Sequence, residues 1–509
     1  MRPSCLKAQL ISKGAQNYSM ASEIKIGLEI HCQLTYLKSK LFCPCYSDYR
    51  FKSPNSNICP ICSGLPGTLP LLNQSALEHA CLLSISLGCK IPSEVIFYRK
   101  NYFYPDLPKN FQLTQYNAYG ITSIGVDGKL EYDTGTTKYA RIRRIQLEED
   151  PGRLVYENNS MDNSFYTLID YNRAGVSLVE IVTEPDFIAP NDVRIFLNKI
   201  TSIVEHLRIC DTRLEGAVRC DANVSIGEGR RVEIKNIGSF KEVEKALSYE
   251  ITRQKTMLAR AIEIKSETRH WDEARKITKQ ARGKETEEDY RYFPEPDIPT
   301  IILDNSFLLE LERNMPELPD QRRRRFIANY ELGAHVSQVL IDNKELSDFF
   351  ESAIAIYPAP KAIANWIVSD LIKFINANNH NQSERNDEGS PSISGLRIEA
   401  KHIAELAKLV DQDIISRATA KGLINQMVKT GEMPSQLVQK TNASKIDDRN
   451  IILDAIETVF KDEMSAVNDA RQNSKATNFL LGKIMHLTKG KADPKIALDL
   501  INKKLIESS

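Results

Sequence analysis

The sequence contains no long apolar run. No uninterrupted hydrophobic stretch reaches the roughly 20 residues that a membrane-spanning helix requires, so we expect no membrane partner and a cytoplasmic location. A net charge is absent too, because 67 lysine and arginine residues balance 67 aspartate and glutamate residues. A nucleic-acid partner would therefore have to be recognised through a local basic patch.

Two familiar signatures are also missing. The sequence has no Gly-x4-Gly-Lys-Ser/Thr phosphate-binding loop and no Gly-x-Ser-x-Gly nucleophile elbow. If the protein uses ATP, the phosphates have to be held by Mg²⁺ on carboxylates and by cationic side chains. Cysteine is sparse, with ten in 509 residues, and no apolar signal sequence precedes them, which suits a reducing compartment.

The length and the residue patterns indicate several domains. Up to about residue 300, strand patterns alternate with turns and with helices at 73–87 and 191–208, and a capping box of Ser239 and Glu242 predicts a third helix to about residue 262. The rest reads as helical. A polar stretch at 376–395 is typical of a linker. We expect four segments: an N-terminal extension at 1–22, a β-rich domain at 23–300, a helical domain at 301–440 and a tail at 441–509.

The first 20 residues carry Arg2, Lys7 and Lys13 and no acid. This bias is typical of an organellar transit peptide. The alternative is that translation begins at Met20, and we prefer it because the segment is short and holds a single arginine.

A polar strand and a cysteine loop open the β-rich segment. Alternation along 24–34 places Glu29 and His31 on one strand face beside Gly27, which leaves room for a ligand, although such a face also occurs without a function. Two close cysteine pairs follow, with the ligand set that tetrahedral zinc requires, and disulfides are the alternative. The four are Cys43, Cys45, Cys59 and Cys62.

Acidic side chains recur on later strands. Three consecutive acids, 148–150, end one strand pattern, and such oxygen-rich clusters suit Mg²⁺. Glu180 lies in an almost wholly apolar strand, where a carboxylate needs a metal or a partner; a buried ion pair with Arg173 is the alternative. A hairpin at 219–236 puts Arg219, Asp221 and Asn223 on one face.

A proline-rich segment, 99–109, combines three aromatic residues with cations and is expected to be a rigid loop. Such a loop would stack a base and place Lys109 on a phosphate, or else it would be an ordinary packed surface loop. The polar residues of these separate segments converge only if their strands form one sheet.

Ten motifs together resemble one family, the B subunits of the tRNA-dependent glutamyl/aspartyl amidotransferases (the GatB family), from about residue 23 to the end. They are Gly27-Leu-Glu-Ile-His31, Lys40-Leu-Phe-Cys43, Cys59-Pro-Ile-Cys-Ser-Gly-Leu-Pro-Gly67, Arg99-Lys-Asn-Tyr-Phe-Tyr-Pro-Asp-Leu-Pro-Lys109, Leu147-Glu-Glu-Asp150, Asn172-Arg-Ala-Gly175, Glu180-Ile-Val-Thr-Glu-Pro-Asp186, Arg219-Cys-Asp-Ala-Asn-Val-Ser225, Glu233-Ile-Lys-Asn236 and Asp289-Tyr-Arg-Tyr-Phe-Pro-Glu-Pro-Asp297. Gln146 and Ser177 depart from the residues that the family often has there, histidine and proline. The first departure weakens the case for a histidine ligand.

The resemblance implies an α+β fold: a cradle domain on an antiparallel sheet with a zinc-binding loop, then an all-α helical domain and a small helical tail that grip tRNA. The implied activity is ATP- and Mg²⁺-dependent phosphorylation of the side-chain carboxylate of Glu-tRNA(Gln) or Asp-tRNA(Asn). Amidation follows, with ammonia from glutamine that the partner amidase, the A subunit, hydrolyses; the small C subunit would complete a heterotrimer. The chain would thus be part of a ligase that forms a carbon–nitrogen bond.

The resemblance also implies roles for single residues. Glu29, His31, Glu148 and Glu180 would ligate or orient Mg²⁺, Lys109 and Arg219 would meet phosphate, and Asp221 and Asn223 would support them. The four cysteines would bind structural zinc.

Two rivals stay open. One is the related archaeal protein that serves Glu-tRNA(Gln) only, for whose extra domain the chain has no room. The other is a non-catalytic zinc-containing tRNA-binding scaffold, which would not need such acidic strand faces.

Overall fold

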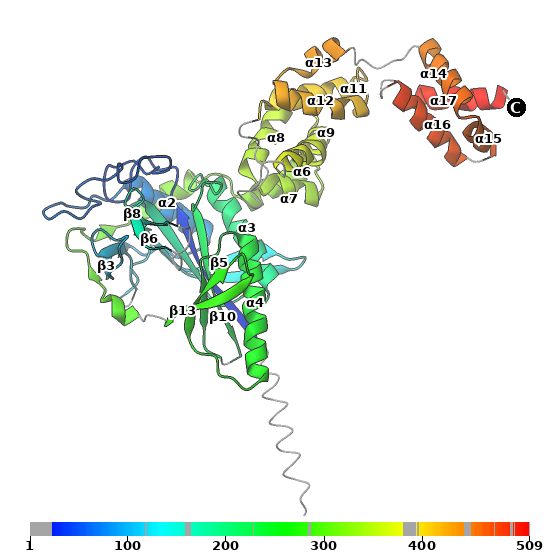
Figure 1. The fold of residues 1–509 in the computed structure, drawn as a ribbon. Helices are drawn as coiled ribbons and strands as arrows, with labels where there is room; N and C mark the ends of the chain where they lie inside the picture. The colour runs from blue at the N-terminus through cyan, green and yellow to red at the C-terminus, as the bar shows by residue number, and fades with distance from the viewer. Residues whose placement is uncertain are drawn as a thin grey trace, which may run out of the picture. The chain divides into compact units, whose positions relative to one another are not determined.

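The computed structural model (Figure 1) describes residues 23–117, 120–157, 164–227, 229–283, 287–379, 393, 396–441, 449–472, 474–488, 492 and 494–507. They form two compact units, one that extends to Pro319 and one that begins at Asp320. The predicted extension at 1–22 and most of the polar stretch at 376–395 lie outside the described residues.

An eight-stranded sheet forms the centre of the first unit. Its strands are β1 Ile24–Gln33, β5 Gly125–Asp133, β6 Thr137–Glu149, β9 Ser177–Thr183, β10 Val218–Ile226, β11 Val232–Lys235, β12 Glu267–Asp272 and β13 Ile277–Gly283, in the order β13-β12-β11-β10-β1-β9-β6-β5. Every pair is antiparallel except β11 and β12, which are parallel. The prediction of an antiparallel sheet is wrong here, because helix α4, Phe240–Ala259, crosses over between these two strands.

Three helices cover the apolar face of this sheet, namely α2 Gln74–Ser86, α3 Pro190–His206 and α4. On β1, Ile26, Leu28 and Ile30 are buried in the core beneath them. The side chains of Asn73 and Ser239 cap α2 and α4 by accepting backbone N–H groups of the first turn. The two helices predicted at 73–87 and 191–208 are confirmed.

Smaller sheets flank the large one. They consist of β3 Tyr98–Asn101, β4 Phe111–Thr114 and β14 Phe293–Pro294 in the order β14-β3-β4, of β2 Glu94–Val95 with β15 Ile301–Ile302, and of β7 Arg153–Tyr156 with β8 Thr167–Asp170. The prediction of a loop over 99–109 is therefore wrong for its first residues, which form the middle strand β3. Both prolines follow that strand, so no ladder hydrogen bond is lost. The hairpin predicted at 219–236 is confirmed as β10 and β11.

The described part of the second unit is helical. Its helices are α6 Pro319–Tyr330, α7 Ala334–Ile341, α8 Lys344–Ile356, α9 Pro360–Asn365, η3 Trp366–Leu371, α10 Ile372–Asn379, α11 Ala400–Asp411, α12 Arg417–Thr430, α13 Pro434–Thr441, α14 Arg449–Asp462, α15 Met464–Gln472, α16 Ser474–Leu487 and α17 Pro494–Glu507. Separate apolar clusters lie before and after the stretch at 442–448. The division of the chain into four segments stays a prediction. No described helix combines the length and the apolarity needed to cross a membrane.

Asp150 anchors the junction that follows β6. Its side chain is fully buried, and its two oxygens accept hydrogen bonds from Arg219 Nη2 at 2.8 Å and from Gln33 Nε2 at 2.6 Å. Arg173 Nε lies 3.8 Å away. Although burial favours the neutral acid, the two arginines hold the pKa of Asp150 below its ordinary value. One carboxylate thus ties β1, β6, β10 and the turn before β9 together.

We expect the substitution Asp150→Asn to lower the free energy of unfolding of the first unit by about 3–5 kcal/mol, because it removes a fully buried anion from two partly buried arginines. Urea denaturation of the full-length chain measures this. Asp127→Asn is the control: it removes an exposed ion pair with Lys90 and should change stability by less than about 1 kcal/mol. Equal effects of the two variants would contradict the anchor.

Candidate active site

The polar face of β1 continues across its neighbours. His31 lies opposite Arg219 on β10 and opposite Glu180 on β9, and Glu180 in turn lies opposite Gln146 on β6. One step along, Glu29 lies opposite Asp221. Residues that face each other across paired strands point to the same side of a sheet. The strands that carry these residues therefore form one sheet, as convergence requires.

Two buried carboxylates flank His31. Its Nε2 atom is 3.8 Å from Glu180 Oε1 and 3.9 Å from Glu148 Oε1. The second oxygen of Glu148 accepts a hydrogen bond from the Thr114 hydroxyl at 2.9 Å. Burial raises the pKa of Glu148 and of Glu180, and the charge of Glu148 raises the pKa of Glu180 further. This arrangement concentrates negative charge that a cation would stabilise.

Glu180 does not form the ion pair with Arg173 that was the alternative to a functional role. Arg173 approaches Asp150 instead, and its guanidinium donates to the carbonyls of Pro151 and Gly152 at 2.9 and 2.6 Å. Among the described residues, the basic side chain within 4.0 Å of the Glu180 carboxylate is His31. Strand β9, which is otherwise almost wholly apolar, therefore carries a carboxylate, Glu180, that faces the polar side of the sheet and is not paired with Arg173.

A second group lies around Glu29. Asn223 Nδ2 donates to Glu29 Oε1 at 3.0 Å, and Lys235 Nζ donates to Asp221 Oδ2 at 2.6 Å. Burial alone would lower the pKa of Lys235, but Asp221 and Glu233 hold it above its ordinary value. Sequence reasoning missed the importance of Lys235; the signal was its place in the hairpin, where it faces Asp221.

A hollow with a volume of about 150 Å³ opens beside this group. Its lining includes Gly27, Glu29, Arg144, Asn223 and Arg231. The Oδ1 atom of Asn223 is buried, and no group in the described part of the chain hydrogen-bonds to it. The hollow combines cations with an unused acceptor next to carboxylates. Arg144 and Arg231 were not among the predicted site residues. A register shift between Ile142 and Arg144 interrupts the simple alternation along β6, and Arg231 lies just outside β11, so the sequence pattern does not show where either side chain points.

The two predicted phosphate ligands are already paired with carboxylates. Lys109 Nζ donates to both oxygens of Glu149, at 2.5 and 2.7 Å, and Arg219 donates to Asp150. Side chains alternate along β6, so Glu149 faces away from the side that carries Glu148. Lys109 therefore lies in a different hollow, of about 260 Å³, between the cysteine loop and β3. The structure does not bring it to the polar face.

The aromatic, proline-rich segment at 99–109 and its surroundings pack against the motif at 289–297, which is also rich in aromatic residues and proline. Tyr116 and Tyr292 are stacked with ring centroids 4.0 Å apart, and Tyr102 meets Tyr290 edge to face at 5.9 Å. Arg99 joins the segments through two hydrogen bonds to Glu295, at 2.6 and 2.7 Å. Of the three aromatic residues in 99–109, Tyr102 is thus used in packing, whereas Phe103 and Tyr104 are exposed.

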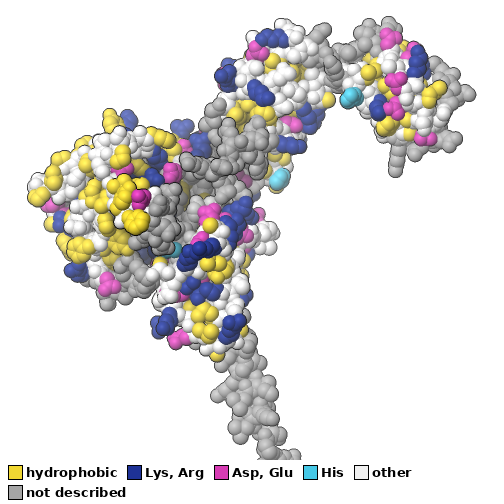
Figure 2. Space-filling view, in the orientation of Figure 1, with side chains coloured by type: hydrophobic (Ala, Val, Ile, Leu, Met, Phe, Trp, Pro, Cys, Tyr) yellow, Lys and Arg dark blue, Asp and Glu magenta, His cyan; other side chains and the backbone are white. Residues whose placement is uncertain are grey.

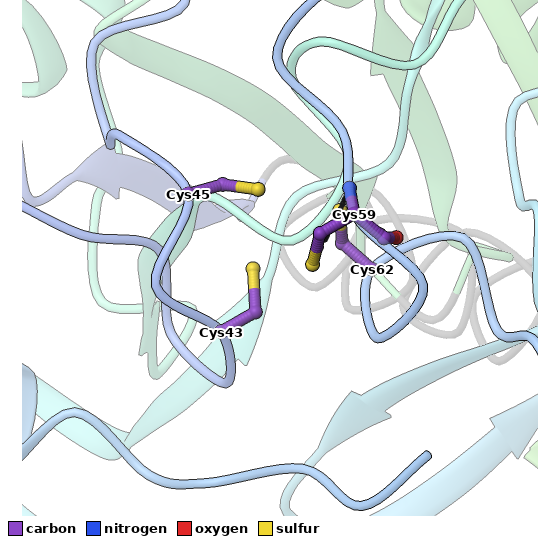
Figure 3. A group of neighbouring side chains, drawn as sticks. All are labelled: Cys43, Cys45, Cys59 and Cys62. Atoms are coloured by element: carbon purple, nitrogen blue, oxygen red, sulfur yellow. Dashed lines mark hydrogen bonds between the residues drawn. The ribbon is translucent and has the colours of Figure 1, made fainter. Parts of the chain in front are cut away.

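The four predicted cysteines converge (Figure 3). Cys43 and Cys45 approach from one turn and Cys59 and Cys62 from another, and their Sγ atoms all lie within 4.8 Å of one another. The Cys59 and Cys62 sulfurs are 3.8 Å apart. Zinc–sulfur bonds of roughly 2.3 Å in a tetrahedron put sulfurs about 3.8 Å apart, so the site fits zinc.

The thiols of this cluster differ in pKa. A hydrogen bond from Cys43 lowers the pKa of Cys62 to about 4, with Lys40 adding to the effect, whereas burial raises the pKa of Cys45 to about 11. A metal ion would displace the remaining protons. Among the described residues, this is the one place where three or more metal-ligating side chains lie close together. The predicted Mg²⁺ ligands are spaced more loosely.

Comparisons with known proteins agree with this architecture. The family model described as the GatB/GatE catalytic domain matches residues 24–309, and the model described as the GatB domain matches residues 348–505. The chain is 43% identical to the B subunit of the aspartyl/glutamyl-tRNA(Asn/Gln) amidotransferase of Saccharolobus solfataricus, over 95% of this chain and 99% of that protein. The protein of the same name in Thermotoga maritima is 42% identical, over 94% of this chain and 98% of its own length.

The first family match falls in the first compact unit and covers the whole polar sheet face, and the second falls in the second unit. The similarity extends over nearly the full length of the compared proteins. The chain therefore belongs to the GatB family.

Proposed function

We propose that this chain is the component of a tRNA-dependent amidotransferase that activates the substrate carboxylate. The γ-phosphoryl group of ATP is transferred to the side-chain carboxylate of Glu-tRNA(Gln) or Asp-tRNA(Asn), which gives an acyl phosphate and ADP. Ammonia then attacks the acyl carbon, and phosphate leaves with its bonding electrons, which yields the amide. The names of the similar proteins supply both substrates, and both remain candidates here.

The observation that carries this proposal is the polar sheet face around His31. A scaffold that only binds tRNA has no need for Glu148 and Glu180 to be buried close to one imidazole, at a cost in desolvation. A phosphoryl-transfer site does need concentrated carboxylates, since they hold the divalent cation that offsets phosphate charge.

The residues fit Mg²⁺ on the chemistry of their donors. Mg²⁺ commonly keeps several waters and takes only one or two carboxylates from the protein, with phosphates completing its shell. Loosely spaced ligands therefore suit it better than a closed cage would. Glu29, His31, Glu148 and Glu180 are the side chains that would hold or orient the ion, and the bound ion would neutralise charge on the transferring phosphoryl group.

The hollow beside Glu29 is the place we assign to the nucleotide phosphates. Among the described residues, the hydrogen bond of Arg144 Nε goes to a neutral partner, Gln146 Oε1, at 2.9 Å. Arg231 is exposed at the rim. These cations take the role that the sequence assigned to Lys109 and Arg219, which the structure pairs with carboxylates. Asn223 then links the hollow to Glu29.

Partners follow from the same proposal. The A and C subunits of the amidotransferase would complete the heterotrimer, with the amidase as the source of ammonia. The first unit exposes Phe51, Leu69, Leu71, Phe103 and Phe165, and hydrophobic side chains gather over part of its surface (Figure 2). Apolar exposure of this kind marks interaction surfaces. The second unit would bind tRNA, and the four cysteines would hold a structural zinc.

We expect His31→Ala to lower ATP-dependent phosphate release by about 100-fold or more, because the imidazole orients both buried carboxylates. Release is measured on the copurified heterotrimer, with ammonium in place of glutamine, on Glu-tRNA(Gln), Asp-tRNA(Asn) and uncharged tRNA. Glu29→Gln should lose activity without unfolding. His335→Ala, at an exposed position of α7, is the control. Release that ignores His31 would favour the scaffold interpretation.

We expect Arg144→Gln to raise the KM for ATP about tenfold with a smaller change in kcat, because it removes a cation from the ground-state phosphate site. Arg141→Gln is the matched control on the same strand. Arg141 pairs with Asp186 and does not line the hollow, so its loss should leave KM unchanged. Identical KM values for the two variants would exclude the hollow as the phosphate site.

A further inference from the structure

Lys40 is a lysine with a completely buried side chain. Its relative exposure is 0%, and its ammonium donates to the Asn57 carbonyl at 2.9 Å and lies 3.8 Å from Cys62 Sγ. A buried ammonium is costly unless an anion accompanies it. Within the described part of the chain, no carboxylate lies within 4.0 Å of Lys40 Nζ, and the acceptor with the capacity for negative charge is the sulfur.

The cysteine cluster supplies that anion only when its sulfurs are reduced. Two disulfides would be neutral and would leave the ammonium uncompensated. Four thiolates on a divalent ion carry a net charge of about −2, which the adjacent Lys40 charge halves. The negative charge of four metal-bound thiolates would therefore stabilise the buried ammonium of Lys40, and the ammonium would stabilise the thiolates.

Lys40 also joins the two halves of the cluster. Its backbone N–H donates to the Cys45 carbonyl at 2.9 Å, which holds the first cysteine turn, while its side chain reaches the second turn at Cys62 and Asn57. Asn57 is fixed in turn, because its backbone N–H donates to Asn172 Oδ1 at 2.7 Å. The ammonium is thus held in place independently of any metal.

We propose that Lys40 is the charge-compensating partner of a tetrathiolate zinc centre and keeps that centre loaded. This inference rests on the zinc that the proposed function assigns to the four cysteines. Groups that contact a metal's ligands from outside commonly contribute a factor of about 10 to 100 to its retention. Lys40 acts on the ligands and takes no part in the phosphoryl transfer.

The test compares full-length wild type with Lys40→Met. Zinc content is measured by plasma emission, and zinc affinity by competition with a chromophoric chelator. We expect one zinc per chain in the wild type and an affinity weaker by about 10- to 100-fold in Lys40→Met. Lys52→Met is the matched control, because Lys52 Nζ bonds Asn57 Oδ1 at 3.1 Å without contact to a sulfur. Its affinity should equal that of the wild type.

A second comparison separates charge from packing. Cys45→His replaces a partly exposed thiolate with a neutral imidazole and lowers the charge of the centre to about −1. Lys40→Met should then weaken zinc binding by a smaller factor than it does beside four thiolates. Where Lys40→Met does not fold, Lys40→Gln serves, since it keeps a donor for the Asn57 carbonyl but no charge.

The outcomes are distinguishable. A wild-type chain without zinc overturns the metal assignment itself. If the wild type contains zinc and Lys40→Met binds zinc with the same affinity, the role of Lys40 is overturned but the zinc assignment is not. If Lys40→Met weakens zinc binding by the same factor in the wild-type background and in the Cys45→His background, charge compensation is overturned. None of these results depends on phosphate release, which tests the kinase site separately.

Discussion

The register of β1 is the constraint on which the proposed site depends. Its apolar residues Ile26, Leu28 and Ile30 are locked in the core, so the opposite face is fixed as polar. A shift of the register by one residue would bury Glu29 and His31 in that core and expose the apolar side chains to water, which would strongly destabilise the fold. The same burial that stabilises the first unit therefore places His31 between β10 and β9. Stability and site geometry have one origin.

The acids at 148–150 show how alternation distributes charge. Glu148 faces the polar side near His31, Glu149 points the other way to Lys109, and Asp150 is clamped by Arg219. Two of the three carboxylates are compensated by cations of this chain, and the pKa of Asp150 is lowered accordingly. Glu148 keeps a raised pKa. Consecutive residues thus have different chemistry because strand geometry sends each to a different environment.

Periodicity in the sequence was enough to predict the helices, the hairpin and the polar face of β1, since these follow from local patterns. The cysteine cluster followed from ligand chemistry alone. The parallel β11–β12 pair was missed because it depends on where α4 returns the chain. Lys109 was misplaced for a related reason: a cation in a loop has no periodicity, and its partner Glu149 is distant in sequence. Arg144 was overlooked because its neighbours come from strands distant in sequence, whereas the predicted hairpin already placed Lys235 near Asp221.

The turn before β9 connects the cysteine loop to the strands of the proposed site. Gly175 has a φ of +84°, so a side chain there would strain the backbone, and a Cβ would lie in contact with Cys62 Cβ at 3.4 Å and Lys40 Cδ at 3.6 Å. Its carbonyl accepts the Leu41 N–H at 2.9 Å, and its own N–H donates to the Asp150 carbonyl at 2.9 Å. Asp150 is the residue that Arg219 clamps. The segment that leads into the cysteine loop is therefore hydrogen-bonded to the same junction at which Asp150 ties β1, β6 and β10 together.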